Sequence, residues 1–97
     1  MERKSIPIHL LVTTKTEIGY HKRPKADFIQ LIQMVGKNKK IDVPIEVYYI
    51  KSGHYVINDG VHRAKAAQLV GLYSIDAIIY TDSLATGIFI PLSEVKW

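Results

Sequence analysis

The 97-residue chain contains no cysteine. This absence excludes disulfide bonds, thiolate metal sites and a cysteine nucleophile. Long apolar runs are absent as well, because no run approaches the roughly 18 apolar residues of a membrane-spanning helix. The apolar part of MERKSIPIHLLV is too short and too interrupted for a signal peptide. We therefore expect a cytoplasmic location and no membrane partner.

The length and composition predict one folded domain over residues 1–97. Hydrophobic residues make up 47% of the chain and charged residues 23%, which is the usage of ordinary globular domains and not of disordered chains. Without disulfides, packing of a modest core must supply the stability. The composition does not specify an oligomeric state.

The basic excess lies in the first half of the chain. Residues 1–50 contain nine Lys or Arg against five Asp or Glu, whereas residues 51–97 contain four of each sign. The clusters HKRPK at 21–25 and KNKK at 37–40 could bind phosphates or nucleic acid. KNKK could equally be a solvated loop, since Gly36 and Asn38 favour turns.

The hydrophobic pattern predicts strand, helix, hairpin, helix and strand in that order. Residues 5–12 alternate as a first strand. An apolar stripe at i, i+3, i+4 and i+7 predicts an amphipathic helix that follows Pro24 and ends at Gly36. Residues 43–50 and 54–58 flank the turn sequence KSG, which predicts an antiparallel hairpin. Residues 74–80 predict an apolar strand, and 88–90 another short one.

The segment DGVHRAKAAQLVG, residues 59–71, predicts a helix whose start can bind an anion. If Asp59 is the N-cap, the first N–H groups of the helix lack intrahelical partners and lie at the positive end of its dipole. Gly60 would let a ligand oxygen approach the backbone closely. His62, Arg63 and Lys65 could then add charged hydrogen bonds to a phosphate.

The same segment has a simpler interpretation. Asp59 could be only a cap and Gly60 only a turn residue. Arg63, Lys65 and Gln68 would then form the solvated face of a helix whose Val61, Ala64, Ala67 and Val70 pack inward.

Residues 44–80, PIEVYYIKSGHYVINDGVHRAKAAQLVGLYSIDAIIY, resemble the core of the ParB/sulfiredoxin superfamily, which includes the ParB-like nuclease domain. In that family a PIxV-like strand precedes a hairpin, a Gly-x-[His/Arg]-Arg helix start, an Ala-rich helix, a Gly and a closing apolar strand. The first predicted strand and helix extend the similarity over nearly the whole chain. The resemblance implies an α/β (α+β) fold, with a small mixed sheet packed with two main helices.

The resemblance also implies that Gly60, His62 and Arg63 bind nucleotide phosphates. In sulfiredoxins the motif reads Gly-Cys-His-Arg, with a catalytic Cys and ATP as substrate, and in partition proteins it reads Gly-Glu-Arg-Arg and serves CTP. Val61 matches neither version, and the lack of cysteine excludes sulfinic acid reduction. The helix-turn-helix region that follows in partition proteins is missing, so we do not expect sequence-specific operator binding.

The leading hypothesis is therefore a nucleotide-binding domain that takes ATP or CTP, with Mg²⁺. His21, Arg23 and Lys25 are candidates for the other wall of the phosphate site, because the family places a polar stretch there. Asp59 would cap the helix or hold Mg²⁺. We expect no structural metal, since no two histidines have metal-ligand spacing on one predicted element.

Three alternatives remain open. One is a nucleic-acid-binding, nuclease-like module that uses the basic first half. Another is a kinase of the same fold that phosphorylates a small hydroxyl compound, for which Asp59 and Glu17 are the candidate catalytic carboxylates. A third is an inactive scaffold that binds protein partners.

Overall fold

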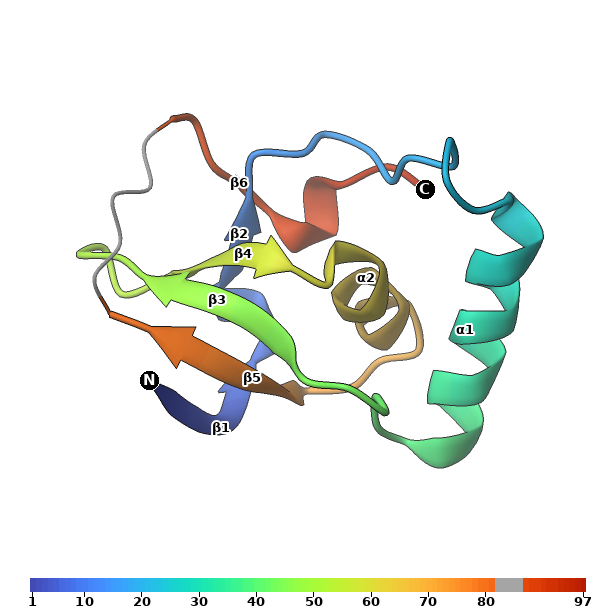
Figure 1. Ribbon diagram of the computed structural model, residues 1–97, viewed down its shortest axis with the longest axis horizontal. Coiled ribbons are helices and arrows are strands. Elements are labelled where there is room, and N and C mark those ends of the chain that lie inside the picture. The colour runs from blue at the N-terminus through green and yellow to red at the C-terminus, as the bar shows by residue number, and fades with distance from the viewer. Residues whose placement is uncertain (82–86) are drawn as a thin grey trace.

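The computed structural model describes residues 1–81 and 87–97, which form a six-stranded mixed sheet with two α-helices (Figure 1). This architecture confirms the predicted α+β class. The elements are β1 (Glu2–Pro7), a 3₁₀ turn (Ile8–Leu10), β2 (Leu11–Thr13), α1 (Lys25–Asn38), β3 (Ile45–Tyr49), β4 (Tyr55–Asp59), α2 (Val61–Leu69), β5 (Ser74–Tyr80), β6 (Ile90–Pro91) and a second 3₁₀ turn (Leu92–Glu94).

The strand order is β1-β5-β3-β4-β2-β6. The predicted hairpin is confirmed, because β3 and β4 pair antiparallel. Strand β5 lies parallel to β3, and β2 lies parallel to β4. The chain passes through β4 and α2 between the parallel strands β3 and β5, because parallel neighbours cannot be joined by a short hairpin. The edge strands β1 and β6 pair antiparallel to their neighbours.

The prediction of one strand over residues 5–12 was wrong. The chain leaves β1 at Pro7, forms a 3₁₀ turn over Ile8–Leu10 and enters β2 at Leu11. Pro7 has no N–H to continue a ladder, and its fixed φ suits the residue before a helical turn. As a result β1 lies at one edge of the sheet, while β2 lies on the other side beyond β4 (Figure 1).

Helix α1 begins after Pro24 as predicted, but it continues past Gly36 to Asn38 and ends with Lys39 in the left-handed conformation, at a φ of 59°. Gly36 serves a different purpose. A Cβ atom there would lie 3.3 Å from the Cγ1 atom of Val70, so the missing side chain lets α1 approach the end of α2.

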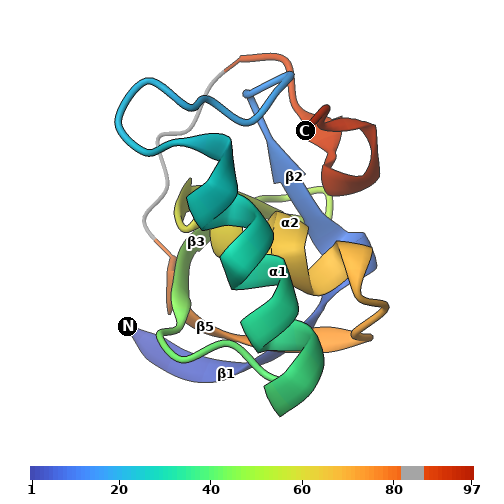
Figure 2. The same cartoon turned by 90° about the vertical axis from the view of Figure 1, so that its right-hand side faces the viewer.

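Helix α2 lies between the sheet and α1 (Figures 1 and 2). Its Ala64, Ala66 and Ala67 have no exposed surface, and these small side chains allow close contact on both sides. The largest fully buried side chains are Ile6, Leu11, Ile45, Leu92 and Val47. Neither helix of the described part of the chain is long and apolar enough to span a bilayer.

Candidate functional site

A cleft of about 920 Å³ opens between α1, the loop after β2 and the junction of β4 with α2. We call it the α1–α2 cleft. Residues 13–15, 19–24 and 57–63 line it, together with one face of α1 and residues 40, 42 and 43 of the loop before β3. Its volume is in the range of small-molecule and cofactor sites. The segment that the sequence marked as phosphate-binding therefore lies in a cleft large enough for a nucleotide.

The N-cap of α2 is Gly60, and the expected Asp59 cap was wrong. Asp59 is the last residue of β4 and makes no side-chain cap hydrogen bond. Gly60 has a φ of 104°, and its carbonyl accepts the Ala64 N–H at 2.9 Å. The strand can turn directly into the helix because glycine tolerates this left-handed backbone. The first turn is thus Val61–Arg63, whose N–H groups have no partner within the helix.

Packing of the junction requires a glycine at position 60. A Cβ atom there would lie 2.6 Å from Cγ2 of the buried Ile45 and 2.9 Å from Nη2 of Arg63. The absence of a side chain therefore serves contact with β3 and Arg63, in addition to any approach of a ligand.

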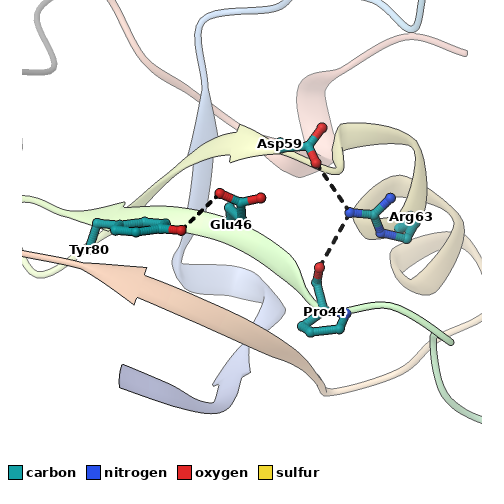
Figure 3. Close-up of polar contacts among 5 residues, drawn as sticks. All are labelled: Pro44, Glu46, Asp59, Arg63 and Tyr80. Atoms are coloured by element: carbon teal, nitrogen blue, oxygen red, sulfur yellow. Dashed lines mark hydrogen bonds and ion pairs between the residues drawn. The ribbon is translucent and has the colours of Figure 1, made fainter. Parts of the chain in front are cut away.

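Arg63 is held at this junction by two neighbours (Figure 3). Its Nη2 atom donates to the carbonyl oxygen of Pro44 at 3.3 Å and lies 3.6 Å from a carboxylate oxygen of Asp59. Within the described residues, its buried Nε atom has no hydrogen-bond partner. The side chain is 26% exposed. Arg63 is therefore oriented by the protein while part of its guanidinium remains available to a ligand.

His62 connects the start of α2 to the loop after β2. Its Nε2–H donates to the carbonyl oxygen of Gly19 at 3.1 Å, so this nitrogen carries the proton. The ring meets Phe28 of α1 edge-on, with 5.9 Å between ring centroids. Tyr20 packs on the same Phe28, with 6.3 Å between ring centroids. His62 and Phe28 thus link three sides of the α1–α2 cleft.

The cleft contains most of the site residues that the sequence suggested. Gly60, His62 and Arg63 line it from the β4–α2 junction, and His21 and Arg23 line it from the loop after β2. Sequence reasoning missed Lys15, Lys22 and Lys40 as site residues, although they also line it. Lys22 stands in the HKRPK cluster and Lys40 in KNKK, so composition contained that signal for two of the three.

Two candidates lie outside the lining. The Lys25 ammonium lies 5.7 Å from the centre of the Trp97 ring, in a cation–π contact. Glu17 forms an isolated bridge with Lys96 through its backbone. Asp59 lines the cleft, so the two proposed catalytic carboxylates are not brought together there.

Lys65 is neither a phosphate ligand nor a solvated residue. It is 3% exposed, and its Nζ atom donates to Oε1 of Gln68 at 2.7 Å and to the carbonyl oxygen of Leu92 at 3.1 Å. Burial lowers the pKa of this ammonium. The side chain points to the segment after β6, away from the cleft.

A second polar pair escaped the sequence analysis. The hydroxyl of Tyr80 donates to Glu46 at 3.1 Å, and this hydrogen bond raises the pKa of Tyr80 (Figure 3). Glu46 lies opposite Asp59 in the β3–β4 ladder. Each of these neighbouring carboxylates therefore has its own partner: Tyr80 donates a hydrogen bond to Glu46, and Arg63 forms an ion pair with Asp59.

No cluster of metal-ligating side chains is present among the described residues. Within residues 1–81 and 87–97, no three His, Asp or Glu side chains gather closely enough to hold a metal ion. The carboxylates that line the cleft are Asp27, Asp42 and Asp59, and Asp59 is paired with Arg63.

No protein-family model matches the sequence, and no curated protein matches it either. The structure, in contrast, is similar to solved structures. The C-terminally truncated chromosome-partitioning protein ParB from Caulobacter crescentus, complexed with CTP-γ-S, matches with a TM-score of 0.67 and 20% identity over 87% of this chain and 47% of that one. The same protein complexed to the centromeric parS site matches with a TM-score of 0.65 and 22% identity, over 84% of this chain and 42% of the other.

Sulfiredoxin from Arabidopsis thaliana matches with a TM-score of 0.64 and 20% identity, over 84% of this chain and 86% of that one. These similarities establish the fold: the chain has the ParB/sulfiredoxin fold, as the sequence resemblance implied. The chain spans about half the length of the ParB structures that it matches.

Proposed function

We propose that this protein binds a nucleoside di- or triphosphate in the α1–α2 cleft, with a phosphate at the N-terminus of α2. The observation that carries the proposal is Arg63. It is oriented by Pro44 and Asp59 beside the free N–H groups of Val61–Arg63, and its buried Nε has no partner among the described residues. Because the Arg63 side chain is already held in position, it loses little conformational entropy when it binds an anion.

The first phosphate would accept hydrogen bonds from the backbone of the first turn of α2, where the helix dipole favours negative charge. Arg63 would add a charged hydrogen bond through the exposed part of its guanidinium. Asp59 would act on Arg63, by keeping the guanidinium in place, and would not contact the phosphate itself, because two anions repel.

Further phosphates would be neutralised by the loop after β2. His21, Lys22 and Arg23 line the cleft there and are exposed, so the charges of Lys22 and Arg23 and a hydrogen bond from His21 can reach a polyphosphate. Helix α1 offers an apolar surface for a nucleoside through Leu31 and the exposed Met34. The similarity to a ParB structure complexed with CTP-γ-S supports a nucleotide as the ligand.

We propose binding without phosphoryl transfer. Transfer to a hydroxyl compound would need a carboxylate free to accept a proton and a metal ion to bridge the phosphates. Asp59 is paired with Arg63, and Glu17 does not line the cleft. Neither Asp59 nor Glu17, the two carboxylates of the kinase alternative, is therefore placed for this role.

Calorimetric titration with ATP, CTP and their diphosphates tests the proposal. The test variant is Arg63→Gln, and the matched control is Arg3→Gln, because Arg3 also pairs with a carboxylate, Asp76 at 3.2 Å, on the edge strand β1. We expect binding by the wild type and Arg3→Gln and a loss of at least about tenfold in Arg63→Gln. Absence of heat with every nucleotide would refute the proposal.

Nucleic acid remains a second candidate. Lys37, Lys39 and Lys40 are exposed at the end of α1, and one similar structure is a ParB complexed to the parS site. Of these three lysines only Lys40 lines the α1–α2 cleft. The two candidate functions thus depend on separable sets of residues.

A further inference from the structure

Residues 92–97, which we call the 92–97 segment, contact all three elements that form the α1–α2 cleft. The carbonyl oxygen of Leu92 accepts a hydrogen bond from Lys65 of α2 at 3.1 Å. The Lys96 N–H donates to the carbonyl of Thr16 at 3.0 Å, and the Ile18 N–H donates to the Lys96 carbonyl at 2.8 Å. The segment is therefore fastened to α2 at one end and to the loop after β2 near the other.

The third contact is made by Trp97. Its ring meets Phe28 of α1 edge-on, with 6.0 Å between centroids, and the Lys25 ammonium lies 5.7 Å from its centre. Trp97 does not line the cleft, but Phe28 does. Phe28 also packs against His62 and Tyr20. Trp97 therefore reaches the lining of the cleft through Phe28 and the aromatic rings packed on it.

The loop next to this cluster carries the basic residues of the second wall. Tyr20 lies immediately before His21, Lys22 and Arg23, and the Gly19 carbonyl is held by His62. The same loop is paired to Lys96 through Thr16 and Ile18. The distance between these basic residues and the start of α2 is consequently set by His62 within the cleft and, from outside it, by the 92–97 segment.

We propose that Trp97 is a positioning residue for polyphosphate binding. It fixes Phe28, and with it the loop of His21, Lys22 and Arg23, at the spacing that lets one ligand contact both this loop and the start of α2. This inference rests on the proposed function. It adds that affinity for the phosphates beyond the first depends on a residue that touches no phosphate.

The chemistry gives a selective readout. A monophosphate would occupy only the start of α2 and Arg63, whereas a triphosphate would also reach the loop. Loss of Trp97 should therefore weaken triphosphate binding and leave monophosphate binding nearly unchanged. A residue that merely stabilised the fold would affect both ligands alike.

The experiment compares wild type, Trp97→Ala and Trp97→Phe by calorimetric titration with whichever of ATP or CTP the wild type binds more tightly, and with its monophosphate. Tyr73→Ala is the matched control, because Tyr73 is 72% exposed, packs on His9 at 5.9 Å and does not line the cleft. We expect Trp97→Ala to lose about tenfold in triphosphate affinity and less than about twofold in monophosphate affinity. Trp97→Phe keeps an aromatic ring at this position and should retain most of the wild-type triphosphate affinity. Tyr73→Ala should bind like the wild type.

A double variant tests the coupling directly. If Trp97 acts by placing Arg23, the losses in Trp97→Ala and Arg23→Ala will not add in the combined variant. Equal losses for the two ligands, or fully additive losses, would overturn the inference. If the wild type binds no nucleotide, the proposed function itself fails. If the wild type binds nucleotide and Trp97→Ala binds it equally well, only the role of Trp97 is refuted and the proposed function stands.

A measurement on the wild type covers the case in which Trp97→Ala does not fold. Trp97 is the only tryptophan of the chain, so its fluorescence reports this position without a label. We expect saturation with the triphosphate to change its emission and the monophosphate to leave it unchanged. Unchanged emission at triphosphate saturation would contradict the inference.

Discussion

The Nη2 atom of Arg63 donates a hydrogen bond to the carbonyl oxygen of Pro44 at 3.3 Å. This hydrogen bond joins the start of α2 to the residue before β3. Position 60 is also restricted to glycine, because any Cβ atom there would meet both the Arg63 guanidinium and Ile45. The glycine and the arginine of the motif are thus parts of one packed junction.

Replacing Gly60 with alanine should lower the free energy of unfolding by more than the strain of its left-handed backbone alone. Gly60→Ala places a residue at a φ of 104° and drives a Cβ atom to 2.6 Å from a fully buried Ile45. Gly71→Ala is the matched control, with a φ of 83° and nothing within 4 Å. We expect a loss of roughly 1–2 kcal/mol in unfolding free energy for Gly71→Ala, and about 1–3 kcal/mol more for Gly60→Ala. Urea denaturation measures both, and equal losses would contradict the clash.

The geometry of Arg63 matters in addition to its charge. Lysine keeps the positive charge but has no planar fork to bond Pro44 and a phosphate at once. We expect Arg63→Lys to weaken nucleotide binding about tenfold, equivalent to about 1.4 kcal/mol, with little change in the urea midpoint. Arg3→Lys, at an exposed ion pair on the sheet edge, should bind like the wild type. If Arg63→Lys also binds like the wild type, charge alone accounts for the role of Arg63.

Local patterns in the sequence were sufficient for several elements. The apolar segment 74–80 coincides with β5, and KSG lies in the turn of the β3–β4 hairpin. Both elements could be predicted because the residues that define each of them are close together in the sequence. The break between β1 and β2 was not predicted, because it depends on their different partners, β5 and β4, which come later in the chain.

The same distinction applies to the candidate site. Gly60, His62 and Arg63 could be found because they are adjacent in a motif. Whether Asp59 or Gly60 caps α2 is decided by Ile45, which comes from another strand. The burial of Lys65 is decided by Leu92, 27 positions later. Contacts of this kind are made by tertiary packing, so no local pattern in the sequence predicts them.

Two exposed lysines should separate the two candidate functions. Lys37 and Lys39 do not line the α1–α2 cleft, so we expect Lys37→Ala/Lys39→Ala to bind nucleotide with wild-type affinity in calorimetry. If the protein also binds duplex DNA through this end of α1, the double variant will bind DNA more weakly. The salt dependence of its DNA affinity will then fall by about one unit for each phosphate that these lysines neutralise in the wild type. Weaker nucleotide binding by the double variant would show that the cleft alone does not define the site.

Tyr80 should contribute stability that disappears at high pH. The hydrogen bond to Glu46 is the main cause that raises the pKa of Tyr80 above its ordinary value of 10.0. The folded state therefore holds this proton more tightly than the unfolded state. The contribution is complete below pH 10 and is lost as the pH rises through the raised pKa. Urea denaturation of wild type and Tyr80→Phe should show a stability difference that shrinks above pH 10, and a constant difference would contradict the hydrogen bond.

Lys65 should show the opposite dependence, because burial lowers its pKa from 10.5. Between the lowered pKa and 10.5 the unfolded state binds more protons than the folded state, so stability rises with pH across this window. Lys65→Met removes the charge while filling similar space, and it leaves the Leu92 carbonyl without its donor, a pH-independent cost of about 1–3 kcal/mol. We expect the unfolding free energy of the wild type to rise relative to Lys65→Met as the pH approaches 10.5. Lys37→Met, at an exposed position, should show no such trend. A flat difference for Lys65→Met in urea denaturation would contradict the lowered pKa of Lys65.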